Sequence, residues 1–221
     1  SGLIMFDLHY GHGKKKPDLA LARQLIADYD HPLRQRLLQP SAGGATLPDI
    51  VVVQSESFFD PTIMKGYEHS HFTPNLRRLA RQGTSGELHV PTFGGGTIRT
   101  EFEMLTGLSL RYFPQMQFPY LQIDARVIPG LARTLRANGY TTLAIHDNDP
   151  GFWNRASALQ RLGFDRFVSI RDFPKNPPLD GRYVSDRALT DEILAQLRDS
   201  GPPQLVFAIS MEAHGPYDGD P

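Results

Sequence analysis

Four side chains that can do chemistry stand at the ends of strand-like segments or of a glycine run. Glu56, His146 and His214 each follow a run of β-branched or apolar residues. Thr97 closes a run of three glycines directly before a helical pattern. In open α/β sheets, ligands bind outside the carboxyl ends of the strands. The sequence therefore predicts that these four side chains meet at one site.

The glycine run at residues 94–96 favours an anion next to Thr97. Glycines let the backbone approach a ligand and direct N–H groups at it, and the positive end of the following helix favours phosphate. A threonine hydroxyl becomes a good nucleophile when a metal ion or a base lowers its pKa. Thr97 could instead only cap the helix, but Thr100 and Glu103 form a better capping box, which gives Glu103 a structural role. We therefore expect Thr97 to be the nucleophile and Gly96 to bind the substrate.

Glu56 and His214 each allow two interpretations. The carboxylate of Glu56 is a hard oxygen ligand for a divalent cation, or it belongs to an exposed or salt-bridged loop residue. His214 follows a strand-like run and precedes Gly-Pro. That position suits a catalytic site, although the composition is also common in turns. His69 and His71 are expected to lie in a solvent-facing loop.

The segment from His146 to Arg155 has the side chains needed to hold a phosphoryl group. His146 is suited to donating a hydrogen bond to a phosphoryl oxygen or to transferring a proton. The planar, forked guanidinium of Arg155 can bind two oxygens of a phosphate at once. The segment also contains Trp153, the only tryptophan of the chain. The alternative is that Trp153 packs a lid and that Arg155 forms a surface ion pair with Asp147 or Asp149.

Strand-like runs alternate with helical patterns, which predicts an α/β sandwich. The run at 50–53 has the composition of a strand buried on both faces of a parallel sheet. Helical patterns and further strand-like runs fill the rest of one main domain, residues 47–221, which follows a helical appendage and linker at residues 1–46. The other predicted strands cover 86–90, 141–145 and 205–210, and the predicted helices cover 74–82, 101–105, 128–138, 156–162 and 185–197.

Composition excludes several classes of function. The 23 basic and 24 acidic side chains nearly balance, so the chain lacks the excess of positive charge that is typical of a nucleic-acid-binding domain. The absence of cysteine excludes disulfides, thiol nucleophiles and cysteine metal sites. No stretch of the chain approaches the roughly 20 apolar residues that cross a bilayer.

Four motifs, in order, resemble those of lipoteichoic acid synthases and related phosphoglycerol transferases of the alkaline phosphatase and sulfatase superfamily. They are Glu56 with Ser57, residues 94–107 around the glycine run, residues 146–155, and residues 211–217. The resemblance covers roughly residues 49 to 217. It implies a three-layer sandwich with a central, mostly parallel sheet, of which this chain is the N-terminal portion.

The resemblance also implies roles for the motif residues. Glu56 and Thr97 would bind the catalytic ion, which is manganese in most of this branch and magnesium or zinc in relatives. Thr97 would attack a lipid phosphodiester and become a glycerophosphoryl-threonine, and His214 would transfer a proton to the leaving group. Four residues would surround the phosphoglycerol headgroup: His146, Trp153, Arg155 and His214.

The implied partners are a phosphatidylglycerol headgroup and a glycan or polyol acceptor, with no nucleic acid. Such an enzyme would be the periplasmic domain of an inner-membrane protein and would reach the membrane through a segment outside this chain. In the family, an Asp-His pair after another strand completes the metal site, and no such pair follows His214, so the chain is expected to be truncated. The alternatives are a sulfatase or phosphodiesterase of the same superfamily, or a binding domain without metal. Residues 97–99 do not fit the common sulfatase motif, which needs Cys or Ser before x-Pro-x-Arg.

Overall fold

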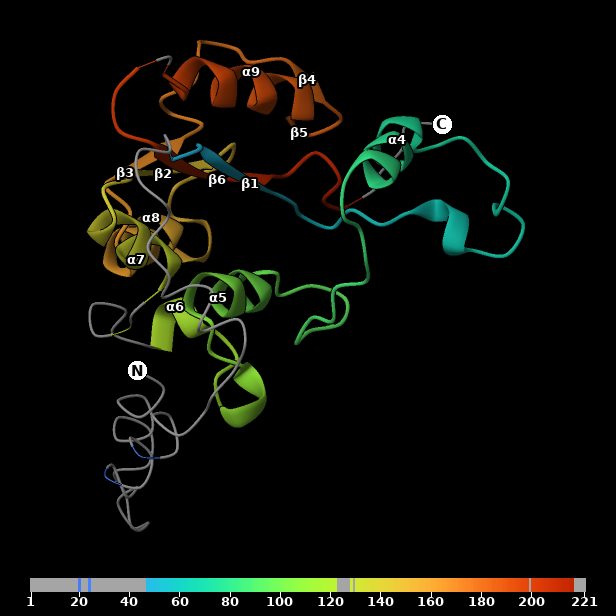
Figure 1. Cartoon of the computed structure of the whole chain (residues 1–221). Coiled ribbons are helices and arrows are strands. Elements are labelled where there is room, and N and C mark those ends of the chain that lie inside the picture. The colour runs from blue at the N-terminus through green and yellow to red at the C-terminus, as the bar shows by residue number, and fades with distance from the viewer. Residues whose placement is uncertain are drawn as a thin grey trace.

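The computed structural model describes residues 47–122, 128, 130–198 and 200–216, together with Ala20 and Gln24 (Figure 1). The predicted appendage and linker at residues 1–46 otherwise lie outside the described residues. No helix among the described residues is long and apolar enough to cross a membrane.

A four-stranded parallel sheet forms the centre of the fold. The strand order is β1-β6-β2-β3, and every neighbouring pair is parallel. The carboxyl ends of these strands therefore meet at one edge of the sheet, where Ser55 pairs with Ser210, and His146 pairs with Ile209 and Ser169. The strands are β1 (Ile50–Ser55), β2 (Thr141–His146), β3 (Arg166–Ser169) and β6 (Gln204–Ser210).

Helices cover both faces of the sheet and produce three layers (Figure 1). Side chains of the central strand β6 alternate between two cores because successive residues of a strand point to opposite faces. Phe207 packs in the larger core with α5, α7 and α8, and Val206 packs in the smaller core with α9. The predicted α/β sandwich is therefore confirmed. The principal helices are α4 (Pro74–Gln82), α5 (Ile98–Thr106), α7 (Leu131–Ala137), α8 (Arg155–Leu162) and α9 (Asp186–Gln196).

The prediction that the strand at 50–53 is buried on both faces was wrong for β1. It pairs only with β6 among the described strands, and its residues alternate between half-buried and exposed. Val52 packs against the larger core, whereas Val53 on the opposite face is 56% exposed. Described helices therefore cover one face of this strand. A continuous β-branched run is compatible with an edge strand as well as with a central one.

Several element boundaries also differ from the predictions. Residues 86–90 form no strand, and Leu88 is largely exposed there. The prediction that Thr100 and Glu103 form a capping box was wrong, because α5 begins at Ile98 and Thr100 therefore lies inside the helix. Glu103 does have a structural role, since its carboxylate accepts a hydrogen bond from the Leu110 amide at 2.5 Å. The unpredicted elements are strands β3, β4 (Leu179–Asp180) and β5 (Tyr183–Val184), helix α6 (Pro119–Gln122), and the 3-10 helices η1 (Pro61–Ile63), η2 (Leu110–Tyr112) and η4 (Phe152–Asn154).

Candidate active site

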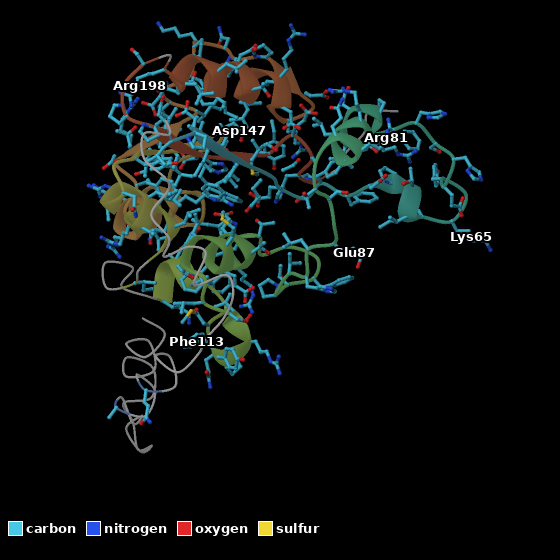
Figure 2. The ribbon with its side chains drawn as sticks, viewed as in Figure 1. Lys65, Arg81, Glu87, Phe113, Asp147 and Arg198 are labelled. Carbon is cyan, nitrogen blue, oxygen red and sulfur yellow. The ribbon has the colours of Figure 1, made fainter. Side chains whose placement is uncertain are left out.

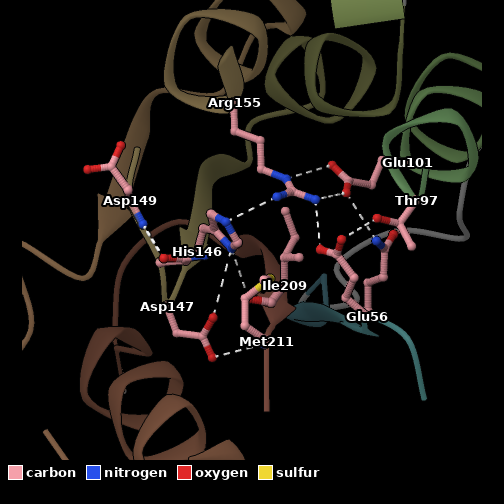
Figure 3. Close-up of polar contacts among 11 residues, drawn as sticks. Glu56, Thr97, Glu101, His146, Asp147, Asp149, Arg155, Ile209 and Met211 are labelled. Carbon is pink, nitrogen blue, oxygen red and sulfur yellow. Dashed lines mark hydrogen bonds and ion pairs between the residues drawn. The ribbon is translucent and has the colours of Figure 1, made fainter. Parts of the chain in front are cut away.

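The hydroxyl of Thr97 contacts the carboxylate of Glu56 at the carboxyl end of β1 (Figure 3). Thr97 Oγ1 donates to Glu56 Oε1, and only 2% of Glu56 is exposed. Thr97 is the residue before α5, but its side chain makes no capping hydrogen bond. The hydroxyl is therefore bonded to a buried carboxylate and does not cap the helix.

The glycine run gives Thr97 its position at the start of α5. Gly94, Gly95 and Gly96 have φ values of +66°, +120° and +70°. Three consecutive residues in this region require glycine, because a Cβ atom strains left-handed backbone. Thr92 stabilises the turn, since its hydroxyl donates to the Gly95 carbonyl. The tight turn brings Thr97 to the positive end of the helix.

Glu56, Thr97 and His214 line one pocket of about 890 Å³, together with part of the glycine run. His214 is half-buried, and its ring packs edge-on against Phe152 and Tyr183 at centroid distances of 6.4 and 5.8 Å. The loop after β6 is held by a hydrogen bond from the His214 amide to the Met211 carbonyl at 2.9 Å. Three residues from distant parts of the sequence thus meet at the predicted edge of the sheet.

Arg155 is fully buried behind this pocket, so the prediction of a surface ion pair was wrong (Figure 3). Its Nη2 donates to Glu56 Oε2 at 2.8 Å and to Glu101 Oε1 at 2.5 Å. Its Nε donates to Glu101 Oε2 at 3.3 Å. Asp149, one of the predicted partners, instead pairs with Arg171 at the surface.

His146 is also fully buried and does not line the pocket. Its Nε2 lies 3.1 Å from Arg155 Nη1, and its Nδ1 lies 3.4 Å from the Ile209 carbonyl oxygen. Burial, followed by the positive charge of Arg155, lowers the pKa of His146 to about 3. The imidazole is therefore neutral at pH 7, accepts a hydrogen bond from Arg155 at Nε2 and donates one from Nδ1.

Trp153 packs beside the site rather than lining the pocket. It has a positive φ of 54°, and its ring stacks on Phe118 at 5.5 Å and lies 5.7 Å from Phe152. The structure thus shows Trp153 in an aromatic cluster. The headgroup contacts of Trp153, His146 and Arg155, and the role of Gly96, stay predictions.

Comparison with known proteins identifies the family. Residues 48–221 match the family model described as Sulfatase. The chain belongs to the sulfatase family. It is 37% identical over 186 residues to a Rhizobium meliloti (strain 1021) protein named for cyclic β-1,2-glucan modification, an alignment that covers 83% of this chain and 28% of that protein. The chain therefore spans little more than a quarter of this relative.

Two solved structures show the same fold as this sulfatase-family chain. The lipoteichoic acid synthase LtaP from Listeria monocytogenes is 26% identical, with a TM-score of 0.64 over 77% of this chain and 42% of that one. The phosphoglycerol transferase GacH from Streptococcus pyogenes, solved with sn-glycerol-1-phosphate, is 21% identical, with a TM-score of 0.66 over 99% of this chain and 53% of that one. At that identity GacH supports the fold alone. The predicted resemblance to lipoteichoic acid synthases is thus confirmed.

Glu101, which no sequence pattern indicated, is the most extensively bonded carboxylate of the site. It is fully buried and accepts hydrogen bonds from Gln54 Nε2 and the Tyr120 hydroxyl, each at 3.1 Å, in addition to those from Arg155. One signal could have found it. Glu101 lies four residues after Thr97, and residues with this spacing share one face of a helix.

Asp147 is a second buried carboxyl group that the sequence did not assign to the site (Figure 2). It is 1% exposed; its Oδ2 accepts a hydrogen bond from the Met211 amide at 3.3 Å, and its Oδ1 has no hydrogen-bond partner among the described residues. Burial raises the pKa of Asp147 to about 7. Asp147 therefore links the end of β2 to the start of the loop that carries His214.

The two predicted metal ligands of this sulfatase-family chain fit a hard divalent cation in their chemistry. Glu56 Oε1 and Thr97 Oγ1 are oxygen donors in direct contact, as neighbouring ligands of one ion would be. The second oxygen of Glu56 is bound to Arg155, which leaves one for an ion. Among the described residues, no group of three or more histidine, aspartate or glutamate side chains could hold a metal. The pair therefore supplies part of a coordination sphere.

Proposed function

We propose that this chain carries the nucleophile of a metal-dependent enzyme that transfers phosphoglycerol from phosphatidylglycerol to an envelope glycan or polyol. The observation that carries the proposal is the contact of the Thr97 hydroxyl with the Glu56 carboxylate, in a pocket that His214 also lines. A threonine at the start of a helix ordinarily caps it. Here the hydroxyl is directed at a carboxylate instead.

The reaction follows from the positions of these three residues. Thr97 Oγ1 attacks the phosphorus of the lipid and its proton passes to solvent, because the one oxygen of Glu56 that Arg155 leaves open is the proposed ligand of the ion. The bond from phosphorus to the diacylglycerol oxygen breaks, and His214 gives that oxygen a proton. Glycerophosphate is left as an ester on Thr97. In a second step, an acceptor hydroxyl attacks the phosphorus and loses its proton to His214, the bond from phosphorus to Thr97 breaks, and the Thr97 oxygen takes up a proton from solvent.

A divalent cation, for which we favour Mn²⁺ over Mg²⁺ or Zn²⁺, would lower the pKa of the Thr97 hydroxyl when bound by Glu56 and Thr97. The glycine run and the positive end of α5 are suited to stabilising charge on the phosphoryl oxygens. We place Gly96 against those oxygens. The headgroup would extend toward the segment that contains Trp153 and Arg155.

The names of the relatives support a glycan or polymer as the acceptor. The Rhizobium meliloti relative is named for modification of a cyclic β-1,2-glucan, and the Listeria monocytogenes structure is a lipoteichoic acid synthase. A lipid donor and an envelope acceptor would place the enzyme outside the cytoplasm, at the inner membrane. Transfer and hydrolysis would use the same first step. The experiment must therefore distinguish a transferase from a phosphodiesterase or a sulfatase.

The test is to look for the covalent intermediate by mass spectrometry. Full-length protein is incubated with phosphatidylglycerol vesicles and Mn²⁺, digested and searched for a glycerophosphoryl group. We expect the group on Thr97, and we expect Thr97→Ala to abolish it. Thr190→Ala is the matched control, because Thr190 is exposed on α9. An adduct that persists in Thr97→Ala, or that lies on another residue, would refute the proposal.

Addition of a cyclic β-1,2-glucan to the reaction separates transfer from hydrolysis. A transferase discharges the Thr97 ester onto the glucan, which gains glycerophosphate. A hydrolase releases glycerophosphate into solution at the same rate with or without the glucan. The second result would replace the transferase assignment by that of a phosphodiesterase.

A further inference from the structure

The guanidinium of Arg155 is shared unequally between two buried carboxylates. Glu101 contacts it through both oxygens, at Arg155 Nε and Nη2, whereas Glu56 contacts it through Oε2 alone. None of the three side chains is more than 2% exposed. The other oxygen of Glu56 accepts from Thr97. Glu101 thus binds Arg155 through both oxygens, whereas Glu56 binds Arg155 through one oxygen and the proposed nucleophile, Thr97, through the other.

The charges of this cluster do not cancel. Arg155 carries one positive charge, and Glu56 and Glu101 carry one negative charge each. The neighbouring His146 is neutral, since its pKa is lowered to about 3. The cluster therefore has one negative charge in excess. Because Glu101 already balances Arg155, the excess is available on Glu56, where it faces Thr97.

We infer that Glu101 is a positioning residue that neutralises Arg155 and so keeps one oxygen of Glu56 directed at Thr97 and at a cation bound there. Without the charge of Glu101, Arg155 would be buried with Glu56 as its only carboxylate. Guanidinium and carboxylate groups favour paired, two-point contacts, so Glu56 would turn its second oxygen toward Arg155. The nucleophile would lose its partner, and the cation would lose a ligand.

Glu101 acts through Arg155 and not on the substrate. Both of its oxygens are occupied, and it does not line the pocket that Glu56 and Thr97 share. Gln54 and Tyr120 hold the carboxylate in place from the sides that Arg155 leaves open. The inference rests on the proposed metal site of Glu56 and Thr97, and it is tested by metal binding, apart from any turnover.

The experiment is a double-mutant cycle on the affinity for Mn²⁺, measured by electron paramagnetic resonance of the unbound ion. Partners that orient a metal ligand typically change affinity by about 10- to 100-fold. We expect a loss in that range for Glu101→Gln, which keeps the shape of the side chain and removes its charge. The double variant Glu101→Gln with Arg155→Met should recover most of the loss, because Glu56 then has no competing cation.

Tyr140→Phe is the matched control, since it removes one neutral hydrogen bond, to the Pro48 carbonyl outside the cluster, and leaves all charges in place. We expect its affinity for Mn²⁺ to equal that of the unsubstituted protein. Thermal unfolding of each variant, measured without metal, separates loss of binding from loss of folded protein. A structural role alone would lower the midpoint of unfolding and leave the affinity of the folded protein unchanged.

Two results would overturn the inference. One is Glu101→Gln binding Mn²⁺ as tightly as the unsubstituted protein. The other is a double variant as weak as the single one, since Glu101 would then act independently of Arg155. If Glu101→Gln does not fold, the double variant carries the test, and Mn²⁺ binding weaker than that of the unsubstituted protein by about 10-fold or more contradicts the inference. An unsubstituted protein that binds no Mn²⁺ would refute the metal site itself, which is a separate outcome.

Discussion

Replacement of Asp147 by asparagine should change how the stability of the protein depends on pH. The pKa of Asp147 is raised by burial from 3.8 to about 7 in the folded protein. Between these values the folded state holds a proton that the unfolded state has lost, so the stabilising effect of the neutral group fades as pH rises. At about 1.36 kcal/mol for each pH unit, ionisation of Asp147 lowers the free energy of unfolding by about 4 kcal/mol from pH 4 to pH 7.

His146, the preceding residue, has the opposite effect over nearly the same range. Its pKa is lowered from 6.5 to about 3, mainly by burial. The unfolded state therefore binds the extra proton, and the free energy of unfolding rises with pH between about 3 and 6.5. In the native protein the two slopes cancel from about pH 4 to 6.5. Asp147→Asn removes the slope due to Asp147. The slope due to His146 remains, so the free energy of unfolding of the variant rises by about 1.4 kcal/mol for each pH unit.

The assay is urea unfolding followed by circular dichroism at half-unit steps from pH 4 to pH 8. The quantity of interest is the difference in unfolding free energy between Asp147→Asn and the native protein, because all other titrating groups drop out of it. That difference should grow in favour of the variant by about 4 kcal/mol from pH 4 to pH 7. Parallel curves over this range would refute the reasoning, since Asp147 would then titrate alike in both states.

Asp149→Asn is the control for this experiment. Asp149 is exposed, and its pKa is lowered, first by the hydrogen bond from the Gly151 amide and then by Arg171. Its stabilising effect is therefore present above pH 4 and is lost only as pH falls through the lowered pKa. The curve of this variant should run parallel to that of the native protein from pH 4 to pH 8.

Two further predictions concern packing around the site, and each is checked by the unfolding free energy in urea. Gly130→Ala should cost about 1–3 kcal/mol, because a Cβ there would lie 2.5 Å from the Leu105 carbonyl oxygen. Gly86→Ala, whose Cβ would have no heavy atom of the described residues within 4 Å, should cost less, and an equal effect would contradict the steric argument. Leu159→Ala should cost about 2–5 kcal/mol, since Leu159 is fully buried in the larger core. Leu194→Ala, at a position that is 62% exposed, should stay within about 0.5 kcal/mol, and similar losses for both leucines would contradict the assigned core.

The convergence of Glu56 and His214 could be predicted because it depends on a general property of parallel sheets. Apolar runs indicated where β1, β2 and β6 end, and parallel strands bring their carboxyl ends to one edge. The contact between Glu56 and Thr97 joins residues 41 positions apart. This contact depends on the glycine run and the start of α5 and not on a strand end, because residues 86–90, which precede the run, form no strand.

The exposure of β1 could not be predicted, because it depends on the order of strands and not on local composition. The β-branched run at 50–53 has the same character that a central strand would have. Burial on both faces requires helices on both sides, and that depends on connections made far away in the sequence. The exposed side chains of Val51 and Val53 are therefore a property of topology.

The environment of Arg155 was unpredictable for a related reason. The sequence offered Asp147 and Asp149 as partners because they are close along the chain. The actual partners, Glu56 and Glu101, are 99 and 54 residues away. A local ion-pair rule cannot select them, since burial of a charge is decided by which elements pack over it and by whether it finds partners there.

Burial of Arg155 with two carboxylates is an expensive way to stabilise a fold. Each charge loses its hydration, and replacing a buried ion pair by apolar residues is often neutral or stabilising. Stability alone therefore gives a weak reason for this cluster. Its arrangement has a better explanation in the chemistry proposed for the pocket, because it leaves a negative charge on Glu56 beside the hydroxyl that loses a proton in the proposed reaction. The neutral form of His146 fits the same explanation, since it adds no charge that would compete for Glu56 or Arg155.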